Sequence, residues 1–194
     1  KNKVLAGFQT AFGWFLNVYI EIFRGTPMIV QSMVIYYGTA QAFGISIDRT
    51  LAAIVIVSIN TGAYMSEIVR GGIYAVDKGQ FEAATALGMT HGQTMRKVVL
   101  PQVVRNILPA TGNEFVINIK DTSVLNVISV VELYFTGNTV ATQNFKYFPT
   151  FTIIAVIYFV LTFTITRILR YIERRLDSDT YTTGANQMQV NEVK

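Results

Sequence analysis

Polar side chains inside long apolar stretches are the residues of this chain whose types and spacing could do chemistry. Drawn as a helix, segment 108–134 carries four of them within about 40° of one line along its surface: Glu114, Asn118, Asp121 and Glu132. Thr122 flanks that line. A charged group at membrane depth costs about 2.5–3.5 kcal/mol, so it usually faces protein or a wet cavity. We therefore expect Glu114, Asn118, Asp121 and Thr122 to line a path for a polar solute, with Glu114 and Asp121 accepting its ammonium group.

A second interpretation of this stripe is structural. Polar side chains of membrane helices also hydrogen-bond to neighbouring helices, and such contacts hold helix bundles together. Lys120 lies about 120° away from the stripe and is expected to pair with another helix or another subunit.

The sequence contains no set of residues that indicates a catalytic site or a metal site. The chain has no Cys and a single His, His91, so thiolate sites and His-rich zinc sites are excluded. The phosphate-binding pattern G-x-x-x-x-G-K-S/T does not occur, so the chain is not expected to hydrolyse ATP itself. We expect a chain that binds no cofactor and is not an enzyme.

The elements that must position these polar residues are membrane helices. Hydrophobic residues make up 51% of the 194 positions and charged residues only 14%, against about a quarter charged in soluble domains. Hydrocarbon is crossed by about 20 apolar residues. The runs between charges predict four spans, within a membrane domain over 1–175 that is followed by a polar, mobile tail over 176–194. The spans are about 27–45, 50–70, 108–134 and 148–170.

Lys and Arg indicate the orientation of these spans. Thirteen of them fall on the side that holds 1–26, 71–107 and 171–194, and two fall on the other side. Because positive charge accumulates on the cytoplasmic side, both ends and the long loop 71–107 are predicted to be cytoplasmic. Residues 4–20 are expected to form an interfacial helix. Since no Met precedes Lys1, we expect residues upstream, including a further span.

The loop 71–107 contains a short amphipathic helix. Phe81, Ala84, Leu87 and Gly88 recur at helical spacing, and Gly88 is expected to end the helix. Such a helix could lie on the membrane surface, or it could insert into a groove on a partner protein. Small side chains at Ala83 and Ala84 would permit a close approach to a partner.

The same loop carries the most specific pattern of the chain. Glu82-Ala83-Ala84 is followed at fixed spacing by Gly88, Val98 and Leu100-Pro101. This pattern resembles the EAA loop of ABC importer permeases, with Val98 where the family usually has Ile. The resemblance implies a coupling helix that seats in a cytoplasmic ATPase. It assigns that role to Glu82, Ala83, Ala84, Leu87, Gly88, Leu100 and Pro101.

Further segments resemble the permeases for polar amino acid uptake. They are residues 19–27, 36–38, 60–70, 113–125 and 171–175. The resemblance implies an all-α bundle, usually of five spans, that works by alternating access. It also implies a second permease subunit, identical or related, and two ATPase subunits that hold ATP and magnesium. An extracytoplasmic binding protein, or a binding domain fused upstream, would deliver the amino acid.

Two other functions stay open at this point. One is an ABC importer for another small solute, such as an opine or a small peptide, which the ligand of its binding protein would reveal. The other is an ion-driven secondary transporter or channel, which needs no ATPase and leaves the loop pattern unexplained.

Overall fold

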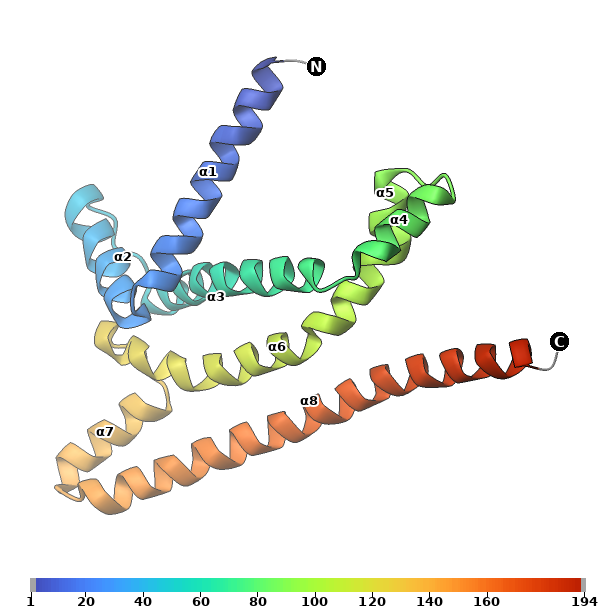
Figure 1. Ribbon diagram of the computed structural model, residues 1–194. Helices are drawn as coiled ribbons and strands as arrows, with labels where there is room; N and C mark the ends of the chain where they lie inside the picture. The colour runs from blue at the N-terminus through green and yellow to red at the C-terminus, as the bar shows by residue number, and fades with distance from the viewer. Residues whose placement is uncertain (1–2, 193–194) are drawn as a thin grey trace. The chain divides into compact units, whose positions relative to one another are not determined.

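The computed structural model describes the backbone of residues 3–192 and the side chains of residues 6–176, and every described element is a helix (Figure 1). The order is α1 (Lys3–Gly25), α2 (Met28–Phe43), α3 (Arg49–Tyr74), α4 (Lys78–Ala86), α5 (His91–Thr94), the π-helix η1 (Met95–Val99), α6 (Leu100–Asp121), the 3-10 helix η2 (Thr122–Ile128), α7 (Leu133–Asn144) and α8 (Tyr147–Glu192). The predicted all-α fold is confirmed.

The chain divides into two compact units. The first comprises Lys1–Ser66 and Ile117–Phe159, and the second comprises Glu67–Val116 and Val160–Lys194. Helices α3, α6 and α8 each contribute residues to both units.

The core of the first unit lies where α2, α3 and η2 meet. Ile56 and Ile128 are fully buried and pack with Ala52, Ala53 and Leu125. The alanines of α3 leave room for the larger side chains of η2. Burying apolar surface in this way stabilises a fold by about 25 cal/mol per Å².

Two buried amides fasten α1, α2 and α3 together in the same unit. The Gln31 side-chain amide donates to the carbonyl oxygens of Phe23 and Thr26, at 2.9 and 2.8 Å. The Asn60 amide of α3 donates to Gln31 Oε1 at 2.9 Å. Gln31 and Asn60 are 6% and 8% exposed. Each amide therefore recovers inside the protein the hydrogen bonds that it loses to water on burial.

The four predicted spans differ in structure: two are continuous helices, one is a bent pair of helices, and one is a single short helix. Two stretches are continuous helices long and apolar enough to cross a membrane, Arg49–Tyr74 and Tyr147–Leu176. A third span results if His91–Ile128 and Leu133–Asn144, bent by 56°, are taken together. The predicted span 27–45 contains only the 16-residue α2, about 24 Å long. Pro27 precedes its first turn, and Gly44 ends it with a left-handed φ of 67°.

The prediction of one continuous helix over 108–134 is wrong in its second half. Helix α6 ends at Asp121, η2 follows, and Ser129 has a left-handed φ of 60° before α7 begins at Leu133 (Figure 1). The break accompanies the packing of η2 against α2 and α3, in which Leu125 and Ile128 of η2 join the buried core.

Helix α8 continues beyond the predicted end of the membrane domain. Its backbone is helical from Tyr147 to Glu192, so it includes most of the tail predicted over 176–194. The side chains of 177–194 and all of residues 193–194 lie outside the described residues, and the mobility of this tail stays a prediction.

Candidate functional site

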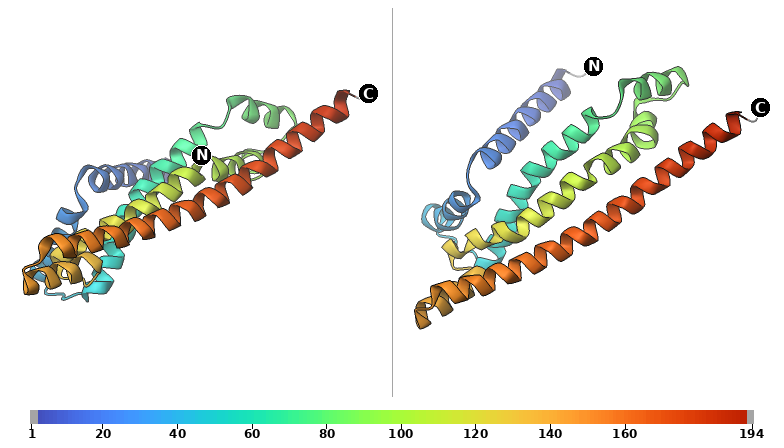
Figure 2. Two further views of the ribbon diagram at one scale, coloured as in Figure 1. Left: turned by 90° about the horizontal axis from the view of Figure 1, so that it is seen from below. Right: turned by 60° about the horizontal axis from the view of Figure 1, so that its bottom comes forward.

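The loop between α3 and α6 folds into a compact helical hairpin of the second unit (Figure 2). Val76, Val99 and Val103 are buried at its centre, and Phe81 of α4 and Met95 of η1 pack against them. Asp77 caps α4 by accepting from the Gly79 amide at 2.7 Å. An apolar core and a capped helix make this hairpin a fixed structure rather than a flexible connector.

Gly88 ends α4 as the sequence predicts. Its φ is 75°, a left-handed conformation that glycine adopts without strain. The Met89 amide donates to the Ala84 carbonyl at 3.1 Å, and the Gly88 amide donates to the Thr85 carbonyl at 2.9 Å. This pair of bonds is the Schellman motif, which satisfies the last carbonyls of a helix while turning the chain sharply away.

Pro101 lies at the junction with α6. It has no N–H and cannot bond to the carbonyl four residues earlier. The preceding turn is widened into η1, in which the Leu100 amide bonds back to the Met95 carbonyl. The helix therefore continues through Leu100-Pro101 without a break, and the hairpin passes directly into α6.

Of the seven predicted coupling residues, only Ala84 is buried; Gly88, Leu100 and Pro101 are exposed, as are the three residues of α4 and its end. Glu82, Ala83 and Leu87 are exposed, and Leu87 is exposed to 81%. Ala84 is only 3% exposed and packs inside the hairpin. Leu87 and Ala84 nevertheless differ in burial: Leu87 caps the C-terminus of α4, with its amide still bonded to the Ala83 carbonyl at 3.1 Å, and its side chain points to solvent. On α4 and its end, the exposed edge that a partner could touch is formed by Glu82, Ala83 and Leu87.

The polar residues predicted for the solute path lie on α6 and at the start of η2. Glu114, Asn118 and Asp121 have i, i+4, i+7 spacing and share one face of α6. Glu114 and Asn118 are half-buried, and Asp121 is exposed. Asn118 Oδ1 accepts from the Thr61 hydroxyl of α3 at 3.1 Å. Thr122 instead donates to the Ile119 carbonyl at 3.0 Å, a bond within its own chain segment.

Glu132 is not on the stripe that the sequence predicts. Its carboxylate caps α7, accepting from the backbone amides of Tyr134 and Phe135 at 2.7 and 2.5 Å. The Tyr158 hydroxyl of α8 donates to the same carboxylate at 3.0 Å. Glu132 therefore has a structural role: it fixes the start of α7 and attaches α8 to it.

Gln31 and Asn60 are the polar residues that sequence reasoning missed. Both lie in uncharged runs, over 25–47 and 50–66. An amide side chain within such an apolar run was the feature of the sequence that could have pointed to them. A buried glutamine or asparagine amide loses its hydrogen bonds to water, so it needs hydrogen-bond partners within the protein. Hydrogen bonds to each other and to the α1–α2 turn supply those partners.

Comparison of the sequence with protein families and with known proteins identifies one family to which the chain is similar. Residues 4–178 match the family model described as "Binding-protein-dependent transport system inner membrane component". The chain is 43% identical over 179 residues to the glutamine transport system permease protein GlnP of Escherichia coli strain K12, covering 89% of this chain and 82% of that one. It is 39% identical over 168 residues to the arginine transport system permease protein ArtQ of Bacillus subtilis, covering 87% and 77%.

Solved structures give the same result. An amino acid ABC transporter crystallised with histidines matches with a TM-score of 0.78 and 45% identity, over 82% of this chain and 74% of that chain. The MetNI methionine ABC transporter, in an inward-facing conformation, has a TM-score of 0.71 at 21% identity, over 82% and 73%. That second likeness concerns the fold alone.

Proposed function

The chain belongs to the family of inner membrane components of binding-protein-dependent transport systems, and from this premise we propose how it works as the permease of an importer for polar amino acids. It is a membrane protein, and it acts as a transport subunit rather than as an enzyme. The observation that carries the substrate class is its likeness to permeases named for glutamine and arginine, at 43% and 39% identity over most of each chain.

Transport of this kind is driven by a partner ATPase. We propose that this ATPase binds ATP and magnesium and receives the edge formed by Glu82, Ala83 and Leu87. These side chains are exposed on the α4–η1 hairpin. The continuous junction at Leu100-Pro101 would pass a displacement of the hairpin on to α6. Alternating access then follows if the ATP-bound partner binds one arrangement of the spans better than the other.

Orientation follows from the charges. Thirteen Lys and Arg fall on the side of the hairpin and of both chain ends. By the positive-inside rule these parts are cytoplasmic, where an ATPase can reach the hairpin. An extracytoplasmic binding protein or fused domain would deliver the amino acid from the opposite side. A second permease subunit, identical or related, would complete the path.

The solute path is proposed to run along one face of α6. Glu114 and Asp121 would accept the ammonium group of an amino acid, and Asn118 would orient it. Thr122 contributes less than its position in the sequence predicts, since its hydroxyl donates to the Ile119 carbonyl.

Reconstitution tests the proposal. The full transporter, in liposomes with its ATPase and binding protein, should accumulate glutamine or arginine only with ATP inside the compartment that holds the ATPase. Gly88→Asp, beside the exposed edge, should still insert but should lose the ATPase in a detergent pull-down. Gly92→Asp is the matched control, because Gly92 is also exposed, lies in the same hairpin and is outside the α4 turn. Uptake in ATP-free vesicles, driven by an ion gradient, would contradict the proposal.

A further inference from the structure

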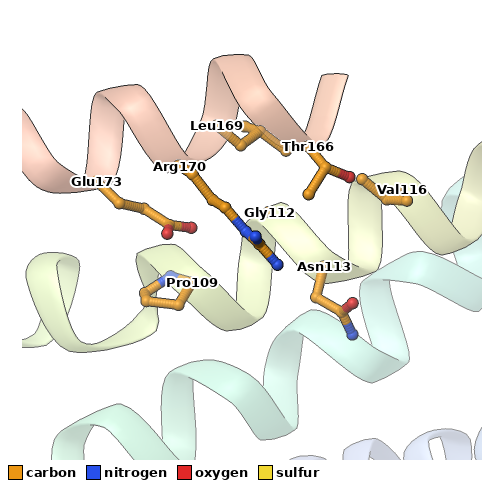
Figure 3. A pocket seen from close by; sticks show the side chains of 8 residues that line it. All are labelled: Pro109, Gly112, Asn113, Val116, Thr166, Leu169, Arg170 and Glu173. Atoms are coloured by element: carbon orange, nitrogen blue, oxygen red, sulfur yellow. The ribbon is translucent and has the colours of Figure 1, made fainter. Parts of the chain in front are cut away.

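A small pocket lies between α6 and α8 in the second unit, separate from the hairpin edge (Figure 3). Its volume is about 230 Å³. The helices approach closely at its floor, where a Cβ on Gly112 would lie 3.4 Å from Leu169 Cδ1. Its polar lining comes from Asn113 of α6 and from Thr166, Arg170 and Glu173 of α8.

An arginine and a glutamate line this pocket without forming an ion pair with each other in the described part of the chain. Arg170 and Glu173 are one helical turn apart on α8, and Figure 3 shows both side chains reaching toward α6. Within the part of the chain whose side chains are described, neither has a hydrogen bond or ion pair. By contrast, Glu67 and Arg70, which have the same sequence separation, pair at 3.2 Å.

This arrangement suits a ligand that carries both charges. A guanidinium binds a carboxylate or phosphate through two parallel hydrogen bonds. A carboxylate in turn accepts from a primary ammonium. Glu173 is half-buried, so a ligand that bonded only to Arg170 would leave this carboxylate facing the pocket without a cation. The volume is below the range of about 300–1,000 Å³ typical of pockets for drug-sized ligands, so the ligand is small.

We propose that the α6–α8 pocket binds a small zwitterion, with its anionic group on Arg170 and its primary ammonium on Glu173. The inference goes beyond import, since binding here requires no transport. Two sources have this chemistry: the phosphate and ammonium of a phosphatidylethanolamine headgroup, and the carboxylate and ammonium of a free amino acid. A headgroup is within reach because the apolar run of α8 ends at Thr166, and Arg167, Arg170, Arg174 and Arg175 follow.

Native mass spectrometry of the whole transporter, purified with its ATPase, tests the lipid source. Samples come from bilayers of phosphatidylethanolamine, phosphatidylglycerol or phosphatidylcholine. Phosphatidylglycerol has the anion but no ammonium, and the quaternary ammonium of phosphatidylcholine has no N–H to donate. We expect the wild type to retain phosphatidylethanolamine about tenfold or more over both, the scale of one charge-assisted hydrogen bond. Calorimetric titration of the delipidated transporter with glutamine tests the amino acid source.

Single-charge variants assign the two roles. Arg170→Gln should lose both phosphatidylethanolamine and phosphatidylglycerol, whereas Glu173→Gln should lose only the preference for phosphatidylethanolamine. In the titration, both variants should weaken glutamine binding about tenfold or more. Arg174→Gln is the matched control, because Arg174 belongs to the same basic segment but does not line the pocket. Thermal melting confirms that each variant is folded, and Arg170→Lys supplies a second variant that keeps the charge.

The possible results of these experiments either support the pocket as a zwitterion site or overturn it. Selective retention of phosphatidylethanolamine, or glutamine binding that depends on both side chains, supports the site and identifies its source. The proposal is overturned if the wild type binds neither ligand, if Glu173→Gln changes nothing, or if Arg174→Gln has the effect of Arg170→Gln. Import is scored separately in the uptake assay, so failure of this site leaves the proposed transport function standing.

Discussion

Substitution of Gly88 measures how much the left-handed turn stabilises the hairpin. A Cβ placed on Gly88 meets no atom within 4 Å, so alanine brings no steric clash there. The remaining cost is conformational, because φ is 75° and a left-handed backbone costs an L-residue about 1–2 kcal/mol. That free energy corresponds to a factor of about 5–30 in the population of the opened turn. Asparagine tolerates this conformation much better, so Gly88→Asn should lose far less than Gly88→Ala.

Hydrogen exchange of the Met89 amide measures the free energy of opening this turn. That amide donates to the Ala84 carbonyl, and it exchanges only when the turn opens. Exchange should accelerate about 5–30-fold in Gly88→Ala and by a much smaller factor in Gly88→Asn. Gly92→Ala is the control, since Gly92 has neither a left-handed φ nor a neighbour within 4 Å of its Cβ. Equal acceleration by alanine and asparagine, or by Gly92→Ala, would refute the conformational reasoning.

Three further predictions concern α6, α7 and α8. Glu114→Gln should weaken uptake of arginine more than uptake of glutamine in the liposome assay, and equal losses would refute a charge-reading role. Glu132→Ala should lower thermal stability by about 1–3 kcal/mol, because three donors lose their acceptor; Tyr158→Phe, which removes one of them, should lose less. Gly137→Ala places a methyl group against Ile154 and should cost about 1–3 kcal/mol in unfolding experiments, and Ile154→Val should recover part of it.

The short helix ended by Gly88 could be predicted from the sequence because the determinants of its ends are local, and the caps that were not predicted from the sequence are local too. Asp77 caps α4 through an amide two residues away, and Gly88 closes it with bonds that span five residues or fewer. Thr90 and Gln93 cap α5 reciprocally across three residues. Each contact joins near neighbours in the chain, so residue types and spacing are sufficient to predict it.

The stripe on 108–134 could be predicted only as far as the helix stays regular. An α-helix turns about 100° per residue and a 3-10 helix about 120°. The seven residues of η2 therefore shift the phase by about 140° relative to α6. Ser129, with its left-handed φ, then resets the direction of the chain before Glu132. Because η2 is held by the core that it forms with α2 and α3, no local pattern in 108–134 predicts the break.

Contacts establish two roles for polar residues in the apolar segments, and a third role is the one that we propose for α6. Gln31 and Asn60 bond to each other and to backbone carbonyls, and Glu132 serves as a cap. Glu114 and Asn118 remain half-buried on one face of α6. The bond from Thr61 occupies the Asn118 oxygen and leaves its amide N–H groups as the donors. In the proposed path along α6, Asn118 would donate to the carboxylate of an amino acid and Glu114 would accept from its ammonium, the two functions that a zwitterionic solute requires.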